Sequence, residues 1–391
     1  MGLIELGVGR ITRDELLTPM TNIRIALNAL SIANRSGTGR AVEGLLDGLS
    51  QLDTPRFQYD ILLPKRHPVK QTWSAAAHLS CHSIGPSSTI ARIAWEQTVL
   101  PLCVRHKKCP VLHSPAFIAP VYGLGRVRSV VTIHDLTFLK FPETIRFGRK
   151  SYFHWAVLSS MEKSHLVLTD CESVRNELIC LGIPCEKIFS LPLGVDERFF
   201  SVSAEEISRV RAKYFLPESY CLTVGTVEPR KNLKTILAAF RLISDVPPLV
   251  IAGRLGWKYD SVFSEIKRGD VPFLDYVEDA DLPALYAGAS LYLASSLYEG
   301  FGLTVLEAMA AGCPVIASDI RAHREIGADC IQYLPPADPV SWASAISSFF
   351  NPQSTIPNAQ SSSRARQFSW RQHAINFERI ILNHAFPGDS L

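Results

Sequence analysis

Two glutamates flank a glycine turn in the segment 298-YEGFGLTVLEAMAAGCPVIAS-318, with seven residues between Glu299 and Glu307. A helical pattern starts near Leu303, so Glu299 falls in the loop and Glu307 about one turn into the helix. The N–H groups around Gly302–Thr304 have no carbonyl partner within such a helix and would hold an anion. A carboxylate deeper in the helix suits a sugar diol, because it accepts two hydroxyl hydrogens.

A second motif, 224-VGTVEPRKNLKTI-236, places two cations where another helix starts. Arg230 and Lys231 follow a proline turn, and Asn232 is of a type that caps helices. Side-chain charge beside free helix N–H groups makes an anion site. The pair alone is more typical of a solvated basic turn. Its place after an apolar run, at the predicted end of a strand, favours phosphate binding.

The elements that must position these residues are short apolar runs alternating with helical patterns. The apolar runs of the first half cover 23–30, 58–64, 110–115, 128–136 and 165–171. Those of the second half cover 220–226, 248–253, 272–277, 290–296 and 331–335. Helical patterns lie between several of them, including 40–52 and 232–243. This alternation predicts parallel sheets covered by helices on both faces.

The chain has 391 residues, which is too many for one ordinary core and favours two domains. The pattern breaks at 190-SLPLGVDERFF-200, which we interpret as the linker. We expect an N-terminal extension, two doubly wound domains and a C-terminal helix that crosses back to the first domain. Their predicted bounds are 1–21, 22–194, 195–365 and 366–391.

Composition excludes several classes of protein. A hydrophobic content of 47% is typical of folded globular chains, and a net charge of +3 is too small to indicate nucleic-acid binding. Nine scattered cysteines form no CxxC pair or Cys/His metal spacing, which favours a reducing compartment. The N-terminus lacks the pattern of a signal peptide, and no apolar run approaches the roughly 20 residues of a spanning helix. We expect a cytoplasmic location, with attachment to the inner face of the membrane as the peripheral alternative.

The spacing of Glu299 and Glu307 resembles the Glu-x7-Glu signature of family 4 retaining glycosyltransferases (group 1), which use nucleotide sugars and have the GT-B fold. VGTVEPRKNL, LVIAGRLGW, YVEDADLPALYAGAS and SLYEGFGLTVLEAMAAGCPVIAS are all similar to that family's second domain; SGTGR, LHSP and TIHDLTFLKFPE are weaker matches in the first. The resemblance covers roughly residues 22–380. It implies an α/β protein with two Rossmann-like domains facing across a cleft, the first for the acceptor and the second for the nucleotide sugar.

The resemblance also implies roles for matching positions. Arg230 and Lys231 would hold the donor diphosphate and stabilise its departure, Glu307 would bind the ribose hydroxyls, and Glu299 would contact the transferred sugar. His134 would sit on the acceptor side, near the anomeric carbon. The positions expected to bind the donor are Gly37, Gly39, Arg230, Lys231, Gly302, Leu303, Thr304 and Glu307. Such enzymes typically need no metal, so we expect no cofactor besides the nucleotide sugar as co-substrate.

Other residues have competing explanations. His134 and Asp135 at a strand end are also typical of a capped turn, although the resemblance favours a functional histidine. For Arg40 and His113 a structural explanation is favoured over a functional one, so neither is assigned a role. Basic residues of the first domain fit a solvated surface; a weaker hypothesis is docking on anionic lipid headgroups. The basic residues in question are Arg105, Lys107, Lys108, Arg126, Arg128, Arg146, Arg149 and Lys150.

The predicted function is transfer of a hexose to a saccharide or lipid-linked saccharide acceptor in surface-polysaccharide biosynthesis. Similarity to bacterial mannosyltransferases favours mannose from GDP-mannose. One alternative is a nucleotide-sugar hydrolase or epimerase on the same fold. Another is a sugar-nucleotide-binding assembly protein without turnover. A dehydrogenase is disfavoured, because no GxGxxG follows a first strand with a suitably spaced acid.

Overall fold

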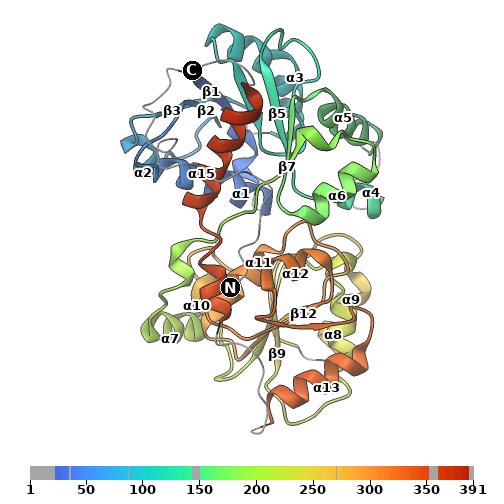
Figure 1. The fold of residues 1–391 in the computed structure, drawn as a ribbon. Helices are drawn as coiled ribbons and strands as arrows, with labels where there is room; N and C mark the ends of the chain where they lie inside the picture. The colour runs from blue at the N-terminus through green and yellow to red at the C-terminus, as the bar shows by residue number, and fades with distance from the viewer. Residues whose placement is uncertain are drawn as a thin grey trace.

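The protein folds into two lobes, one above the other in Figure 1. The upper lobe runs from the first strand to β7, and the lower lobe holds β8 to β13. This computed structural model describes residues 23–34, 37–86, 88–142, 150–269, 271–351 and 360–386. The predicted extension at 1–21 therefore lies outside the described residues.

The upper lobe is built on a seven-stranded parallel sheet in the order β3-β2-β1-β4-β5-β6-β7. The strands are β1 (Arg24–Asn28), β2 (Gln58–Pro64), β3 (Leu79–Gly85), β4 (Val111–Ser114), β5 (Arg128–Ile133), β6 (Leu166–Thr169) and β7 (Ile188–Ser190). The helices are α1 (Gly37–Ser50), α2 (Gln71–Ala75), α3 (Thr89–His106), α4 (Thr137–Lys140), α5 (Lys150–Lys163) and α6 (Glu172–Cys180). The strand order reverses between β1 and β4, which makes the sheet doubly wound.

The lower lobe repeats this plan with six parallel strands in the order β10-β9-β8-β11-β12-β13. The strands are β8 (Cys221–Val224), β9 (Leu249–Ala252), β10 (Phe273–Leu274), β11 (Leu291–Ala294), β12 (Val315–Ser318) and β13 (Gln332–Leu334). Its helices are α7 (Ala204–Lys213), α8 (Leu233–Phe240), α9 (Asp260–Arg268), α10 (Leu282–Ala287), α11 (Leu303–Ala310), α12 (Arg321–Gly327), α13 (Pro339–Phe349) and α14 (Ser361–Ala365). The strand order reverses between β8 and β11, and residues that follow these two strands line one cavity.

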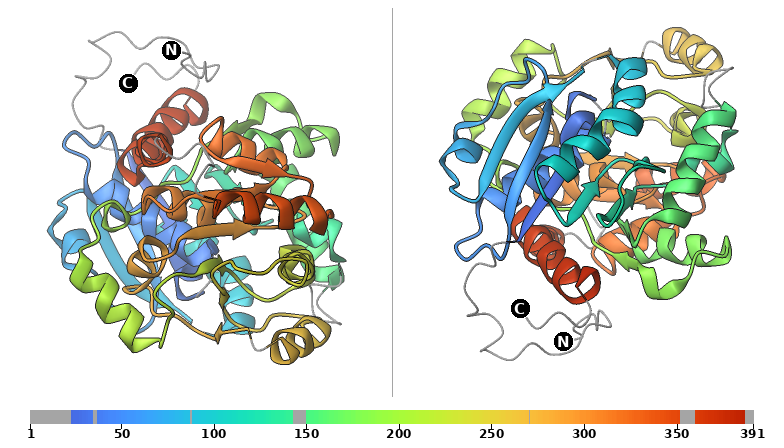
Figure 2. Two further views of the ribbon diagram at one scale, coloured as in Figure 1. Left: turned by 90° about the horizontal axis from the view of Figure 1, so that it is seen from below. Right: turned by 90° about the horizontal axis from the view of Figure 1, so that it is seen from above.

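The last helix, α15 (Trp370–Ile380), packs on the upper lobe although it follows the lower one. Both views of Figure 2 show this red helix beside the blue first elements of the chain. Phe377 and Ile381 share a buried core with Leu46 of α1. The chain thus crosses between the lobes twice, and the Val195 N–H donates to the Phe368 carbonyl (2.9 Å) where the crossings meet.

The structure confirms the two doubly wound α/β lobes and differs from expectation in detail. The helix predicted at 40–52 begins earlier, because α1 already starts at Gly37. Asn232 occupies the N-cap of α8 with φ of 53°, yet its amide donates to the Ser295 and Pro336 carbonyls instead of capping. Among the described residues, no helix is both long and apolar enough to cross a bilayer.

Candidate active site

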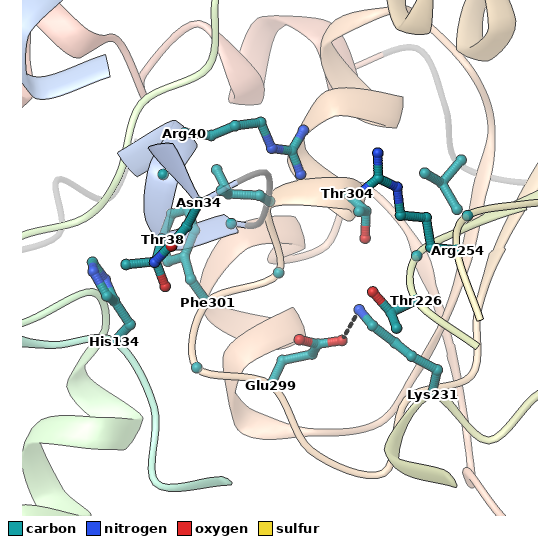
Figure 3. Close-up of a pocket in the computed structure, with 18 of the residues that line it drawn as sticks. Asn34, Thr38, Arg40, His134, Thr226, Lys231, Arg254, Glu299, Phe301 and Thr304 are labelled. Atoms are coloured by element: carbon teal, nitrogen blue, oxygen red, sulfur yellow. Dashed lines mark hydrogen bonds and ion pairs between the residues drawn. The ribbon is translucent and has the colours of Figure 1, made fainter. Parts of the chain in front are cut away.

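A cavity of about 500 Å³ lies between the lobes, beyond the carboxyl ends of strands from both sheets. Figure 3 shows His134 of the upper lobe across the cavity from Lys231 and Arg254 of the lower lobe. The predicted positions that line it are Gly37, Gly39, His134, Arg230, Lys231, Glu299, Gly302, Leu303 and Thr304. Glu307, the remaining predicted position, does not line the cavity. The tertiary structure therefore gathers in one cleft nearly every residue that the two motifs singled out.

The glycine turn brings the start of α11 to the cavity wall. Gly302 occupies the N-cap with φ of 109°, a conformation that favours glycine. A Cβ added there would also lie 3.2 Å from the side chains of His323 and Ile326. Leu303 and Thr304 form the first turn of the helix and line the cavity. The helix start thus directs N–H donors and the positive end of its dipole at this space.

Glu299 is held between the two predicted cations. Arg230 Nη1 lies 2.7 Å from Glu299 Oε2, and Lys231 Nζ lies 2.6 Å from Oε1. Burial alone would raise the pKa of Glu299, but Arg230 and Lys231 hold it well below the usual range. Glu228 also pairs with Arg230, at 2.7 Å. The charges of Glu228 and Glu299 balance those of Arg230 and Lys231. Positive potential toward the cavity must therefore come from the start of α11 and from Arg254.

Glu307 is covered by a residue from the other lobe. Its carboxylate forms an ion pair with Arg40 of α1 and accepts a hydrogen bond from the Tyr286 hydroxyl (3.1 Å). The Glu307 side chain is 6% exposed, whereas Arg40 is 30% exposed and lines the cavity. Burial raises the pKa of Glu307, and Arg40 opposes that rise. Arg40, to which the sequence assigned no role, therefore stands between the cavity and the predicted ribose ligand.

His134 follows β5 and is buried, with both ring nitrogens engaged. Nδ1 lies 2.8 Å from Asp170 Oδ2, and Nε2 lies 2.8 Å from the Pro115 carbonyl oxygen. Burial lowers the pKa of His134, but Asp170 outweighs it and the net direction is upward. Two acceptors around one ring favour the doubly protonated imidazolium. In this arrangement the ring is not free to take a proton from an acceptor hydroxyl.

The two glycines at the start of α1, Gly37 and Gly39, have different surroundings. Gly39 lies in the first turn of α1, where a Cβ would overlap the Asn34 carbonyl oxygen. Gly37 has open space around it, with no atom within 4 Å of an added Cβ. Both line the cavity opposite the α11 start. Gly39 is therefore required by the tight approach of its own chain, while Gly37 leaves room in the cleft.

Sequence reasoning missed several residues of the site besides Arg40. Arg254 follows β9 and lies with its guanidinium 4.5 Å from the centre of the Tyr276 ring, after β10. Asp275 and Asp279, in the loop after β10, also line the cavity. Arg254 stands at the end of a predicted strand in the motif LVIAGRLGW, and this position could have indicated that it lines the cavity. Nothing local indicated that the loop after the very short β10 would reach the same cavity.

Comparison with known protein families agrees with this geometry. Residues 36–199 match the family described as Glycosyltransferase Family 4, and residues 218–351 match Glycosyl transferases group 1. The O-antigen chain mannosyltransferase B of Escherichia coli is 33% identical over an alignment of 279 residues that covers 68% of this chain and 72% of that protein. The chain belongs to the group 1, family 4 glycosyltransferases.

Other glycosyltransferases extend the comparison. The O-antigen chain mannosyltransferase RfbU of Salmonella typhimurium is 28% identical, over 63% of each chain. Among solved structures, HepE (Alr3699) of Anabaena in complex with UDP-glucose superposes with a TM-score of 0.73 at 15% identity, covering 92% of this chain and 100% of that one. At that identity the likeness shows the fold, and it confirms the predicted GT-B architecture of this glycosyltransferase.

Proposed function

We propose that this glycosyltransferase moves a hexose from a nucleotide sugar to a saccharide or lipid-linked saccharide acceptor, with retention of the anomeric configuration. GDP-mannose is the preferred donor, because the relatives named above are mannosyltransferases of O-antigen chains. Surface-polysaccharide biosynthesis is the corresponding context. The observation that carries the proposal is the buried Glu299, held between Arg230 and Lys231 at the start of α11, on the wall of the cleft.

The donor diphosphate would lie against the start of α11. Arg230 offers five N–H donors and Lys231 three, so both can bind phosphate oxygens without leaving Glu299. Arg254 and the first-turn N–H groups of α11 supply positive potential that Glu228 and Glu299 do not cancel. These groups stabilise the negative charge that grows on the diphosphate as the sugar departs. Charge compensation by side chains and backbone is the basis for proposing a metal-independent reaction.

Glu299 would contact the transferred sugar. Because Arg230 and Lys231 hold its pKa low, it is a carboxylate throughout the working pH range and not a proton donor. A fixed negative charge stabilises the positive charge that develops at the anomeric carbon. His134 would form the acceptor side of the cleft, as a wall whose ring is held by Asp170 and Pro115.

Glu307 would bind the ribose hydroxyls, in exchange for Arg40. The ion pair and the Tyr286 bond occupy one carboxylate oxygen each, and Arg40 separates both from the cavity. A ribose diol reaches them when the guanidinium moves aside, and the released Arg40 would then lie near the diphosphate. The affinity for the donor therefore depends on Arg40 as well.

The nucleobase would lie in the part of the cavity formed by the loops after β9 and β10. Asp275, Asp279 and Arg254 line that part, and Arg254 stacks on Tyr276. Guanine presents adjacent N–H donors along one edge, which a carboxylate accepts as a pair, whereas uracil has a single N–H donor there. Two exposed aspartates favour a guanine nucleotide at this position.

A donor panel tests the proposed function. The purified chain is incubated with GDP-mannose, GDP-fucose, UDP-glucose and UDP-galactose, with and without a lipid-linked oligosaccharide, and nucleotide release and glycan mass are measured. We expect GDP release from GDP-mannose that depends on acceptor and persists in EDTA, and a product with retained anomeric configuration by NMR. Release without acceptor would indicate a hydrolase or epimerase. Donor binding without release from any donor would indicate a non-catalytic binding protein.

Peripheral attachment to a membrane is a second part of the proposal. Exposed apolar side chains Ile90 (68%) and Leu102 (61%) lie on α3, which ends beside the exposed Arg105. Exposed apolar side chains near a cation suit an anionic lipid surface. Two of the predicted basic residues serve the fold instead: Lys107 pairs with Asp60, and Arg128 donates to the Ala385 carbonyl. Arg146 and Arg149 lie outside the described residues.

Vesicle co-sedimentation tests this attachment. We expect binding to vesicles that contain phosphatidylglycerol, weaker binding to phosphatidylcholine alone, and loss of binding in the double variant I90S/L102S. Lys234, exposed on α8 of the lower lobe, is the site for a control variant, K234S. Binding that ignores anionic lipid content would contradict the attachment.

A further inference from the structure

Tyr298 belongs to the lower lobe but is buried in the upper one. It precedes Glu299 in the loop after β11 and is 8% exposed. Its ring packs in the core cluster that contains Ile118, Leu136 and Phe138 of the upper lobe. A side chain next to a predicted catalytic glutamate thus extends across the domain boundary.

The hydroxyl of Tyr298 has both of its partners in the upper lobe. It accepts the N–H of Leu136 (3.0 Å) and donates to Glu177 Oε2 (3.0 Å). Lys140 Nζ pairs with the other oxygen of Glu177 at 2.6 Å and lies 4.1 Å from the centre of the Tyr298 ring. The ring and the hydroxyl are therefore held by one charged cluster on the far side of the cleft.

The residue on the other side of Glu299 is also held by the upper lobe. The Cys171 thiol donates to the Gly300 carbonyl oxygen (2.8 Å). A Cβ added at Gly300 would overlap the carbonyl oxygen of His134. Both neighbours of Glu299 in the chain are thus fixed by the opposite lobe, and Glu299 alone points back to the cations of its own lobe.

The same guanidinium links these contacts to the donor site. Arg230 Nη1 donates to the Tyr298 carbonyl (2.9 Å) and to Glu299 Oε2 (2.7 Å). A shift of Tyr298 would therefore displace both Glu299 and Arg230. Misplacement of a positioning group by about 1 Å can cost on the order of 10²-fold in rate.

We propose that Tyr298 is a positioning residue for transfer: its hydroxyl anchors the loop 298–300 to the upper lobe and thereby sets Glu299 and Arg230 toward the donor. The inference rests on the proposed role of Glu299. It adds that the two lobes must be in contact at Tyr298 for the donor site to be in its reactive geometry. The diphosphate contacts of Lys231 and of the α11 start do not pass through this anchor.

The variant Tyr298→Phe tests the proposal, because it keeps the ring and removes only the hydroxyl. We expect kcat for transfer to fall about tenfold or more, while the Kd values of GDP and UDP by calorimetry change less than about threefold. The matched control is Tyr220→Phe, since the Tyr220 hydroxyl is buried and donates to the Leu285 carbonyl (2.7 Å) within the lower lobe. Wild-type kcat in Y298F, or the same loss in both variants, would overturn the proposal.

Glu177→Gln provides a second test through the partner side chain. If Tyr298 and Glu177 act through one hydrogen bond, the kcat losses of Y298F and E177Q are not additive in the double variant. Additive losses would overturn the anchor. Amide hydrogen exchange over residues 296–303 decides the question independently of turnover: faster exchange in Y298F than in Y220F supports the anchor, and equal exchange contradicts it. A wild-type protein inactive with every donor counts against the proposed function alone, because the exchange measurement still decides this inference.

Discussion

At the scale of single residues, the two glutamates of the signature have opposite electrostatic environments. Both are buried, but Glu299 has two cations within 2.7 Å and its pKa is lowered, whereas Glu307 pairs with Arg40 and its pKa is raised. The difference lies in their partners, since burial acts on both in the same direction. Glu299 is thus a fixed anion, and Glu307 is an acceptor whose charge depends on Arg40.

Lys231→Ala should abolish most transfer while the fold stays intact. The Lys231 ammonium is one of two side-chain cations at the proposed diphosphate position, and its loss should reduce kcat/KM by about 10²-fold or more. Lys234→Ala, three residues later on α8 and exposed, is the control and should keep wild-type activity. Steady-state kinetics and circular dichroism measure the two properties. Full activity in folded K231A would contradict the diphosphate role.

Arg40→Ala should destabilise the protein by leaving the Glu307 carboxylate buried without its cation. We expect a loss of about 1 to 2 kcal/mol in the free energy of unfolding, less than for a fully buried pair because Arg40 is 30% exposed. The double variant R40A/E307Q should recover part of the loss, since no unpaired charge is left. Urea unfolding at pH 7 measures the difference. If R40A/E307Q is no more stable than R40A, the ion pair of Arg40 and Glu307 does not stabilise this contact between the lobes.

At the scale of elements, α11 is bounded by two glycines that serve different ends. Gly302 starts the helix with φ of 109°, and Gly312 follows it with φ of 73°. An added Cβ at Gly302 would meet His323 and Ile326, while one at Gly312 would meet nothing within 4 Å. The first glycine places the helix start on the cavity wall, and the second only ends the helix.

Alanine at each of these glycines should separate stability from activity. Both G302A and G312A put a Cβ in the left-handed region and should each cost about 1 to 2 kcal/mol of unfolding free energy. Only G302A should also reduce transfer, by about tenfold or more, because it shifts the N–H donors of the α11 start. Thermal unfolding and initial rates check this. Equal losses of activity in both variants would show that the position of the helix start is not critical.

At the scale of the whole molecule, α15 joins the end of the chain to the first lobe. His373 on this helix is buried, and its Nδ1–H donates to the Pro192 carbonyl oxygen (2.8 Å). Burial lowers the pKa of His373 to about 4, and the pKa of the neighbouring buried His113 to about 3. Seating the C-terminal helix therefore depends on histidines that stay neutral.

Replacing His373 should change how stability depends on pH. A histidine in the unfolded chain takes up a proton near pH 6.5, whereas His373 in the folded protein does so only near pH 4. The contribution of neutral His373 to the free energy of unfolding is therefore complete above pH 6.5 and is lost as the pH falls. Between pH 7 and pH 5 this contribution to the free energy of unfolding falls by about 2 kcal/mol. Glu378 on the same helix, with a pKa raised to about 7, acts in the opposite direction, so variants must be compared.

The comparison uses urea unfolding of wild type, His373→Asn and His106→Asn at pH 7 and 5. We expect the change in stability on acidification to differ by about 2 kcal/mol between H373N and wild type. His106, exposed at the end of α3, is the control and should leave the change unaltered. Identical pH dependence in all three proteins would contradict the burial of a neutral His373.

Much of the fold could be predicted because buried parallel strands are continuous apolar runs. The bounds of β2 were predicted to the residue, and α11 begins at Leu303, where its start was predicted. The strands β3 and β7 were not predicted, because β3 is a sheet edge with polar residues, LSCHSIG, and β7 has three residues beside the linker. The helical start of α1 at Gly37 was also missed, since glycine pairs locally favour a loop.

By itself the sequence determined the two doubly wound lobes, the helix start near Leu303 and the position of Arg230, Lys231 and Glu299 after neighbouring strand ends. Each of these follows from local periodicity and from the rule that parallel strands end at one edge. Only the tertiary structure decided that Arg40 covers Glu307, 267 positions away, and that Tyr298 is anchored at Leu136, 162 positions away. Such contacts arise when two finished domains pack against each other, and the burial that sets the charge of each glutamate arises with them.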